Sequence, residues 1–148
     1  MTQMLASPLD VLAAYTAAVS ASDQEAFLGL YAGDARVFDA WEVWEYQGKD
    51  IWRKTVASWF NWAGEDGGHD RPRFEEVQVS AGETHAFISA IVHYDHFDAE
   101  GKLSRSVRNR MSLGLVRQGE GWLIQQEHTS VPGSMDKYDE LLAEPPAA

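Results

Sequence analysis

The sequence contains no cysteine among its 148 residues. This absence excludes disulfide bonds, thiolate nucleophiles and metal sites built on cysteine. Basic residues are also few, because 12 Lys and Arg stand against 23 Asp and Glu and give a net charge of -11. A nucleic-acid-binding surface needs positive charge to meet the phosphates, so we expect no nucleic-acid partner.

Long hydrophobic runs are missing as well. No apolar stretch approaches the roughly 20 residues that a membrane-spanning helix needs, so we expect no membrane partner. The first ten residues, MTQMLASPLD, lack the basic start and apolar centre of a signal peptide, and we expect a cytoplasmic protein. With 45% hydrophobic and 24% charged residues, the composition predicts one globular domain over residues 1–148.

Aromatic residues are concentrated in the stretch from Tyr31 to Trp62, which carries five of the six tryptophans. Asp39 lies inside this aromatic run. A carboxylate among tryptophans and tyrosines is typical of a pocket for a mostly apolar ligand, although a core built of tryptophans gives the same pattern. Because an acid is costly to bury without a partner or a purpose, Asp39 is a candidate functional residue.

Periodicity and capping signals predict three helices. Ser7-Pro8 marks the start of the first, whose apolar face carries Tyr15. Ser22 and Glu25 form the pattern of a capping box for a second helix that Gly33 is placed to end. A strand over 34–39 and an irregular aromatic segment to residue 46 precede a third helix, whose expected core face is formed by Trp52, Val56, Trp59 and Ala63.

After Pro72 the hydrophobic period becomes that of strands separated by glycine-bearing turns, over about residues 73–80, 85–97, 103–117 and 122–130. Short connections of this kind make an antiparallel meander. The predicted fold class is therefore α+β, with the helices packed on one face of a curved antiparallel sheet. Both faces of the segment 85–97 carry apolar residues, so we expect a homodimer through the sheet; isolated apolar residues on the surface are the alternative.

Three further features can be compared with known families: Tyr-Ala-Gly-Asp-Ala-Arg-Val at 31–37, the helix start at Gly48 and the ending Gly-Trp-Leu-Ile-Gln-Gln-Glu-His-Thr-Ser at 121–130. Together with the order of the elements, they resemble the SnoaL-like group of the NTF2-like superfamily. The resemblance implies a cone in which helices are wrapped by a curved sheet, with a pocket between them and commonly a dimer. Such cones include ketosteroid isomerases, polyketide cyclases, dehydratases and non-catalytic modules, so the fold alone does not select a function.

Ketosteroid isomerases are similar from Val11 to Asp39 without a gap. This similarity puts Tyr15 at the position of their oxyanion-hole tyrosine and Asp39 at that of their catalytic base. A carboxylate there can take a proton next to a carbonyl while a phenol hydrogen-bonds the enolate. The isomerase's protonated aspartic acid would fall near residues 112–114, which contain no carboxylate, so we do not expect a true steroid isomerase. A core tyrosine with its hydroxyl tied down is the alternative for Tyr15.

Strand parity divides the polar candidates of the sheet. His93 and Asp95 share one face of their strand, whereas His128 shares a face with Trp122 and Ile124 unless a bulge resets the alternation. The closing His-x-Ser pattern resembles that of many SnoaL-like proteins and favours a pocket role for His128, with a hydrogen-bonded histidine at a strand end as the alternative.

Arg110 resembles the arginine of the family's penultimate strand. It could bind a substrate carboxylate or pair with Glu127 across the strands.

No metal site or cofactor is expected. Helical His-x-x-x-His spacing, a phosphate loop, a dinucleotide fingerprint and a nucleophile elbow are all absent from the sequence. A cluster of His93, Asp95 and His128 is the one arrangement that could hold a divalent ion. A short tail helix over about residues 134–144 could cap the cone mouth or lie on a partner subunit.

Two function hypotheses follow. The first is a cofactor-independent isomerase, cyclase or dehydratase acting on a hydrophobic carbonyl compound, with Asp39 as acid or base and with Tyr15 and His128 as hydrogen-bond donors. The second is a non-catalytic ligand-binding or dimerisation module of the same fold. In either case the expected ligand-binding residues are Trp41, Trp44, Trp59, Tyr31, Phe38, His93, Asp95 and Arg110.

Overall fold

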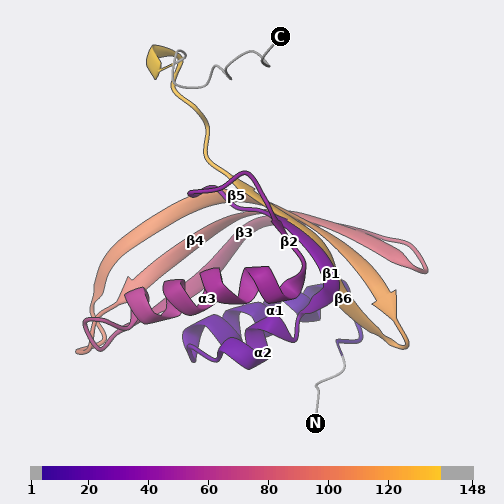
Figure 1. The fold of residues 1–148 in the computed structure, drawn as a ribbon, viewed down its shortest axis with the longest axis horizontal. Helices are drawn as coiled ribbons and strands as arrows, with labels where there is room; N and C mark the ends of the chain where they lie inside the picture. The colour runs from indigo at the N-terminus through magenta and orange to yellow at the C-terminus, as the bar shows by residue number, and fades with distance from the viewer. Residues whose placement is uncertain (1–4, 138–148) are drawn as a thin grey trace.

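The computed structural model describes residues 5–137 as a curved six-stranded sheet that arches over three helices (Figure 1). The α+β prediction is therefore confirmed. In chain order the elements are α1 (Pro8–Ser20), α2 (Gln24–Leu28), β1 (Tyr31–Phe38), β2 (Tyr46–Gln47), α3 (Lys49–Ala63), β3 (His69–Ala81), β4 (His85–Phe97), β5 (Leu103–Gln118), β6 (Gly121–Ser130) and the 3-10 turn η1 (Met135–Lys137).

The strand order is β2-β1-β6-β5-β4-β3. All neighbouring strands are antiparallel except β1 and β6, which pair in parallel and bring the first and last strands of the chain side by side (Figure 1). Helix α1 packs against β3 and helix α3 against β1, so the concave face of the sheet encloses the core. Its fully buried side chains include Val11, Phe27, Val37, Ile88 and Leu113.

Local signals account for the ends of the helices, with one correction. Ser7 caps α1 in a capping box with Asp10, as the Ser7-Pro8 signal predicts. The capping box expected at Ser22 is wrong, because the N-cap of α2 is Asp23, whose carboxylate accepts from the backbone N–H of Ala26. Helix α2 also ends earlier than expected, at Gly29, and Tyr31 therefore belongs to strand β1.

Strand β6 contains the irregularity that matters most for the site. Leu115 pairs with Ile124, but Gly114 pairs with Gln126, so β6 carries one extra residue at this point. A bulge of this kind bends the strand and shifts which side chains face the core. Trp122 and Ile124 point inward before the bulge, and Glu127 and Thr129 are the buried residues after it.

The tail prediction is tested only over its first residues. The turn η1 occupies Met135–Lys137, and the rest of the expected tail helix lies outside the described residues. Within residues 5–137 no helix is both long and apolar enough to cross a membrane.

The two ends of β5 offer a matched test of the core. Leu113 is fully buried, whereas Leu103 on the same strand is half exposed. We expect Leu113→Ala to lower the free energy of unfolding by about 2 to 5 kcal/mol, since it removes buried methyl groups and leaves a cavity. The same change at Leu103 should cost less than about 1 kcal/mol. Urea denaturation of both variants checks this, and equal losses would contradict the assigned burial.

Candidate functional site

Four polar side chains meet inside the cone: Tyr15 from α1, Tyr31 from β1, Tyr94 from β4 and Glu127 from β6. We call this group the interior cluster. The hydroxyls of Tyr15 and Tyr94 lie 2.8 Å apart and share a hydrogen bond. The hydroxyl of Tyr31 donates to Oε1 of Glu127 at 2.7 Å. Burial raises the pKa of Tyr15 and of Tyr31 well above that of a free tyrosine, so both hydroxyls keep their protons.

Glu127 is the titratable centre of the interior cluster. Its side chain is only 2% exposed. Burial raises its pKa to about 7, with a further increase from the charge of Asp39, while the hydrogen bond from Tyr31 lowers it. No cationic side chain of the described residues contributes to this pKa. The carboxyl group therefore changes charge near neutral pH, as a group suited to acid–base chemistry does.

Asp39 lies at the edge of the interior cluster, just beyond the end of β1. Its Oδ1 accepts a hydrogen bond from the hydroxyl of Thr129 at 3.1 Å. Burial raises the pKa of Asp39, whereas the hydrogen bonds from Thr129 and the backbone of Ala40 lower it. The charge of Asp39 raises the pKa of both Glu127 and Tyr94, so the two carboxyl groups and the tyrosines are electrostatically coupled.

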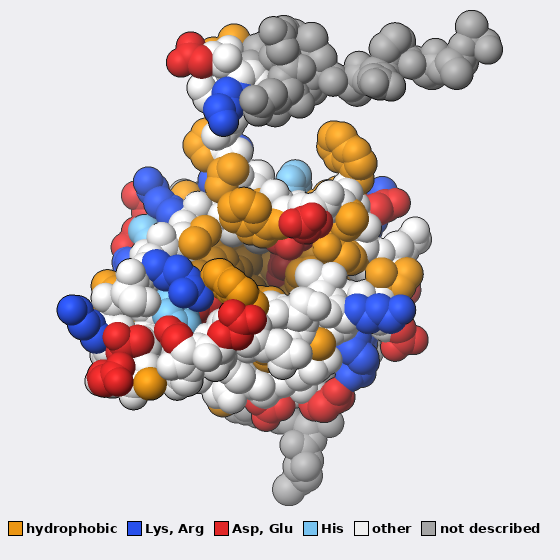
Figure 2. Space-filling model, turned by 60° about the vertical axis from the view of Figure 1, so that its left-hand side comes forward, with side chains coloured by type: hydrophobic (Ala, Val, Ile, Leu, Met, Phe, Trp, Pro, Cys, Tyr) orange, Lys and Arg blue, Asp and Glu red, His pale blue; other side chains and the backbone are white. Residues whose placement is uncertain are grey.

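An open groove of about 730 Å³ begins at Asp39; we call it the mouth groove. Its walls come from the segment after β1 and from the end of β6, and they include Phe38, Trp41, Val43, Trp44, His128, Thr129 and Val131. Trp44 is 92% exposed, an unusual state for a side chain with so large an apolar surface. Figure 2 shows one face of the molecule hollowed, with hydrophobic side chains around the hollow and acidic side chains within it.

The mouth groove contains five of the residues that the sequence singles out, among them Asp39, His128 and Trp44. The interior cluster contains Tyr15 and Tyr31. Trp59 does not line the mouth groove; its ring packs edge-on against Tyr94 at 5.5 Å between centroids. The aromatic stretch is therefore divided between the mouth groove and the core.

A bulge in β6 decides the orientation of His128. It resets the alternation after Ile124, so His128 does not share the face of Trp122 and Ile124; its side chain is exposed, and its ring packs edge-on against Phe38 at 5.4 Å. His128 lines the mouth groove together with Asp39, whereas Tyr15 lies in the interior cluster. Glu127, the neighbour of His128 in sequence, takes the inward position instead.

Three further candidates lie on the outer face of the sheet. The carboxylate of Asp95 accepts hydrogen bonds from Arg73 at 2.9 Å and from Ser106 at 2.6 Å. Both bonds lower the pKa of Asp95, and the bond from Arg73 has the larger effect. His93 lies 3.2 Å from a carboxylate oxygen of Glu75.

Arg110 also points outward, where it donates to the hydroxyl of Ser130 at 3.2 Å, so the expected pairing with Glu127 does not form. Within the described part of the chain, no group of three or more His, Asp or Glu side chains is arranged to hold a metal ion.

Sequence reasoning missed two members of the interior cluster. Alternation along β4 predicts that Tyr94 faces inward, but its contact with Tyr15 depends on the tertiary fold. The inward orientation of Glu127 was not predicted, because regular alternation along β6 would turn it outward and the bulge reverses this. The register pairs Glu127 with Leu113, at the centre of the stretch where the isomerase-like acid was expected and not found. The carboxyl group absent from β5 is thus present on the adjacent strand.

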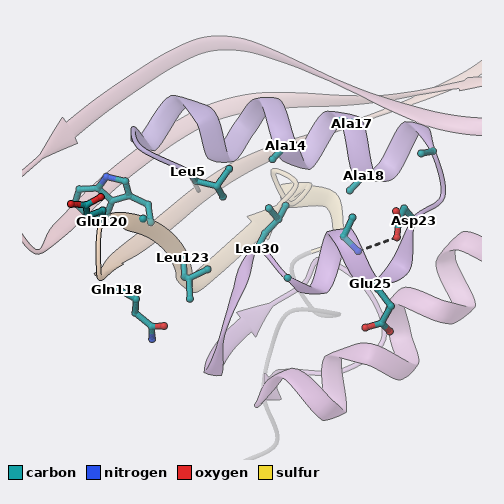
Figure 3. Close-up of a pocket in the computed structure, with 15 residues that line it drawn as sticks. Leu5, Ala14, Ala17, Ala18, Asp23, Glu25, Leu30, Gln118, Glu120 and Leu123 are labelled. Atoms are coloured by element: carbon teal, nitrogen blue, oxygen red, sulfur yellow. Dashed lines mark hydrogen bonds between the residues drawn. The ribbon is translucent and has the colours of Figure 1, made fainter. Parts of the chain in front are cut away.

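A second depression lies at the other end of the cone, between α1, α2 and the β5–β6 turn (Figure 3). It is open and about 890 Å³ in volume. Leu5, Leu30 and Leu123 line it with alanines of α1, and Asp23, Glu25 and Glu120 lie around it. None of the candidate catalytic or ligand-binding residues lines this depression, and the mouth groove remains the candidate site because it borders Asp39, which is coupled to Glu127.

Comparison with known proteins agrees with this architecture. A solved NTF2-like protein of unknown function from Pseudomonas putida KT2440 is 22% identical, with a TM-score of 0.74 over 87% of each chain. Aln2 from a Streptomyces species is 15% identical, with a TM-score of 0.74 over 85% of this chain and 93% of that one. A putative scytalone dehydratase from Novosphingobium aromaticivorans is 16% identical, with a TM-score of 0.67 over 80% and 77%.

At these identities the structural likeness concerns the fold. A comparison with curated proteins found no match. The model of the SnoaL-like domain matches residues 9–134, which is most of the sequence. The chain therefore belongs to the SnoaL-like domain family and has its NTF2-like fold.

Proposed function

We propose that the protein is a cofactor-independent enzyme that transfers a proton next to the carbonyl group of a hydrophobic ligand, in an isomerase, cyclase or dehydratase reaction. The observation that carries the proposal is the buried carboxyl group of Glu127, whose pKa is about 7. The charge of Asp39 raises this pKa, and the hydrogen bond from Tyr31 lowers it. Two coupled carboxyl groups in different environments are how an apolar site divides the roles of acid and base.

Asp39 is the proposed base, because it alone of the two carboxyl groups borders the mouth groove. Its carboxylate would accept the proton when the C–H bond breaks, and the electron pair would move to the carbonyl oxygen to form an enolate. Phe38, Trp41 and Trp44 would hold the apolar body of the ligand. In an isomerase, the proton on Asp39 would return to another carbon as the carbonyl re-forms. In a dehydratase, the enolate would expel a hydroxyl group that takes the proton from Asp39 and leaves as water. In a cyclase, the enolate carbon would bond a second carbonyl carbon of the ligand, and the oxygen of that carbonyl would take the proton from Asp39.

Glu127 and the tyrosine pair are the proposed partners of the enolate. Protonated Glu127 can donate a hydrogen bond, in the manner of the isomerase acid that β5 lacks. The hydroxyls of Tyr15 and Tyr94 hold two hydrogens between them, and their mutual bond uses only one. One donor of the pair therefore remains for a ligand oxygen.

A binding module without chemistry is the second candidate, and one observation favours it. The interior hydroxyls and Glu127 already bond one another, which satisfies buried polar groups as a purely structural network would. Such a module would hold an apolar ligand in the mouth groove and leave the interior cluster unchanged.

Stability should depend on pH through Glu127. Its pKa is about 7 in the fold against 4.5 for a free side chain, so its stabilising effect is complete below 4.5 and is lost as pH rises through 7. Between pH 5 and pH 8 this loss amounts to roughly 2 to 3 kcal/mol. Urea denaturation at both pH values should show that Glu127→Gln removes that part of the pH dependence. An unchanged difference would mean that Glu127 titrates normally.

Activity should depend on Asp39. A thermal-shift screen with cyclic ketones and polyketide-like aromatic compounds would supply a ligand, because a molecule that binds only the native state raises its melting temperature. For a compound that turns over, Asp39→Asn should lower kcat by roughly 10²- to 10⁴-fold. Asp34→Asn, the same change at an exposed position of β1, should leave kcat near that of the wild type. Full activity in Asp39→Asn would remove this residue from the mechanism.

The homodimer through the sheet is also a proposal. Its support is an apolar pair on the outer face, Phe87 at 56% exposed and Ile91 half-buried. If this face is the interface, Phe87→Glu should shift the mass measured by light scattering from dimer to monomer. Leu9→Glu, which alters a similarly exposed side chain on α1, should leave the mass unchanged. A monomeric wild-type protein would exclude the dimer.

A further inference from the structure

A buried histidine lies between two carboxylates on the β3 and β4 side of the sheet, across from β1 and Asp39. His96 on β4 is 1% exposed. Its Nδ1 lies 2.7 Å from Oδ1 of Asp70 on β3, and its Nε2 lies 2.8 Å from Oδ2 of Asp66 in the loop between α3 and β3. Asp70 is itself buried and accepts a second hydrogen bond, at 2.8 Å, from the indole N–H of Trp59.

This geometry favours one protonation state of His96. A neutral imidazole has one N–H donor and one lone pair, so it can donate to only one carboxylate. With a carboxylate opposite each ring nitrogen, the neutral ring would aim a lone pair at an anion. The imidazolium donates to both, and its charge is compensated on each side. The arrangement therefore favours the protonated ring.

The hydrogen bond between His96 and Asp66 connects the sheet to the loop of residues 64–68. This loop contains three glycines, and Gly68 is the one that lies against the backbone of β4. A Cβ atom on Gly68 would lie 2.1 Å from the carbonyl oxygen of Phe97, so this contact requires glycine. The backbone N–H of Gly68 also donates to Oδ1 of Asp66, which aims the other carboxylate oxygen at His96.

The same histidine reaches the interior cluster through Asp70. Asp70 holds the indole of Trp59, and the ring of Trp59 packs edge-on against Tyr94, which bonds Tyr15. Asp70 therefore connects His96 to Trp59, which contacts the tyrosine pair directly.

We propose that Asp66, His96 and Asp70 form a proton-dependent latch, which fastens the loop 64–68 to the sheet while His96 is protonated. Loss of one ring proton removes one of the two bonds. The bond to exposed Asp66 is the one released, because Asp70 is buried and keeps its bond from Trp59. The loop then detaches from the sheet.

The charged groups around His96 set the pH range of the latch. Asp66 faces it from the loop, Asp70 from β3 and Arg105 from β5, the last at 3.8 Å from Asp70. Burial lowers the pKa of His96, but the two carboxylates outweigh burial and Arg105 and raise it above 6.5. The bond to His96, with that from Gly68, lowers the pKa of Asp66 below 3.8.

These directions define where the latch holds. The contribution of His96 is complete below pH 6.5 and is lost as pH rises through its raised pKa. The contribution of Asp66 is complete above pH 3.8 and is lost as pH falls through its lowered pKa. The latch is therefore closed in mildly acidic solution and opens on the alkaline side.

Nitrogen-15 NMR of the imidazole rings tests the proposal directly. In the wild-type protein at pH 6, both ring nitrogens of His96 should be protonated, and its titration midpoint should lie above 6.5. Asp66→Asn should lower the midpoint by about one pH unit. Hydrogen exchange of the amides of 64–68, corrected for the intrinsic pH effect, should rise roughly tenfold at the same midpoint. The indole N–H signal of Trp59, identified with Trp59→Phe, should move with it.

Two variants separate the latch from a static contact. Glu65→Gln removes the same charge from the same loop without touching His96, and its titration should follow the wild type. Gly68→Ala should raise exchange of the loop amides at every pH, because it displaces the loop by contact alone. A single protonated ring nitrogen at pH 6, or loop exchange with no step at the midpoint of His96, would overturn the proposal. These measurements need no substrate, so they stand apart from the test of Asp39.

Discussion

The burial of one carboxyl group, that of Glu127, constrains the rest of the site. An ionised carboxylate in an apolar interior is costly without a cation, and no described cation meets it. The cost is reduced in two ways, by the hydrogen bond from Tyr31 and by a pKa near neutrality that lets the group lose its charge. Every other polar side chain of the interior cluster is a neutral hydroxyl, which can lie near either form of the acid.

Buried charge is treated differently on the two sides of the sheet. On the β1 and β6 side, no described cation compensates Glu127, and the charge of Asp39 adds to the tendency of Glu127 to keep its proton. On the β3 and β4 side, Asp66 and Asp70 enclose a histidine and favour its protonated form. Trp59 lies between the two groups, because it donates to Asp70 and packs against Tyr94 of the interior cluster.

Much of the fold follows from the sequence because its signals are local. Ser7 caps α1, Gly48 precedes α3, and the alternation of β4 extends over the predicted residues 85–97. The boundaries that differ have local causes too, since Asp23 competes with Ser22 as a cap and Tyr31 joins a strand that pairs in parallel with β6. Such a parallel pairing joins the two ends of the chain, and no neighbouring residues predict it.

The sequence predicts those site residues whose position depends on a single helix or strand end. It does not predict those whose orientation depends on how β6 pairs with its neighbouring strand. Asp39 and Tyr15 were identified from an aromatic environment and a family resemblance, and both lie in or beside the interior cluster. Glu127 and His128 are adjacent in sequence, and only the bulge decides which of them is buried. A bulge changes the face of all following residues without an obvious change in composition.

The bulge in β6 thus determines which functional group faces the interior. Without the bulge, and with no residue gained or lost, regular alternation would put His128 on the inward face with Ile124 and turn Glu127 outward. Related cones could therefore exchange a carboxylic acid for an imidazole through the gain or loss of a bulge. A sequence alignment, which compares residues and not strand register, would overlook this change in the inward-facing group.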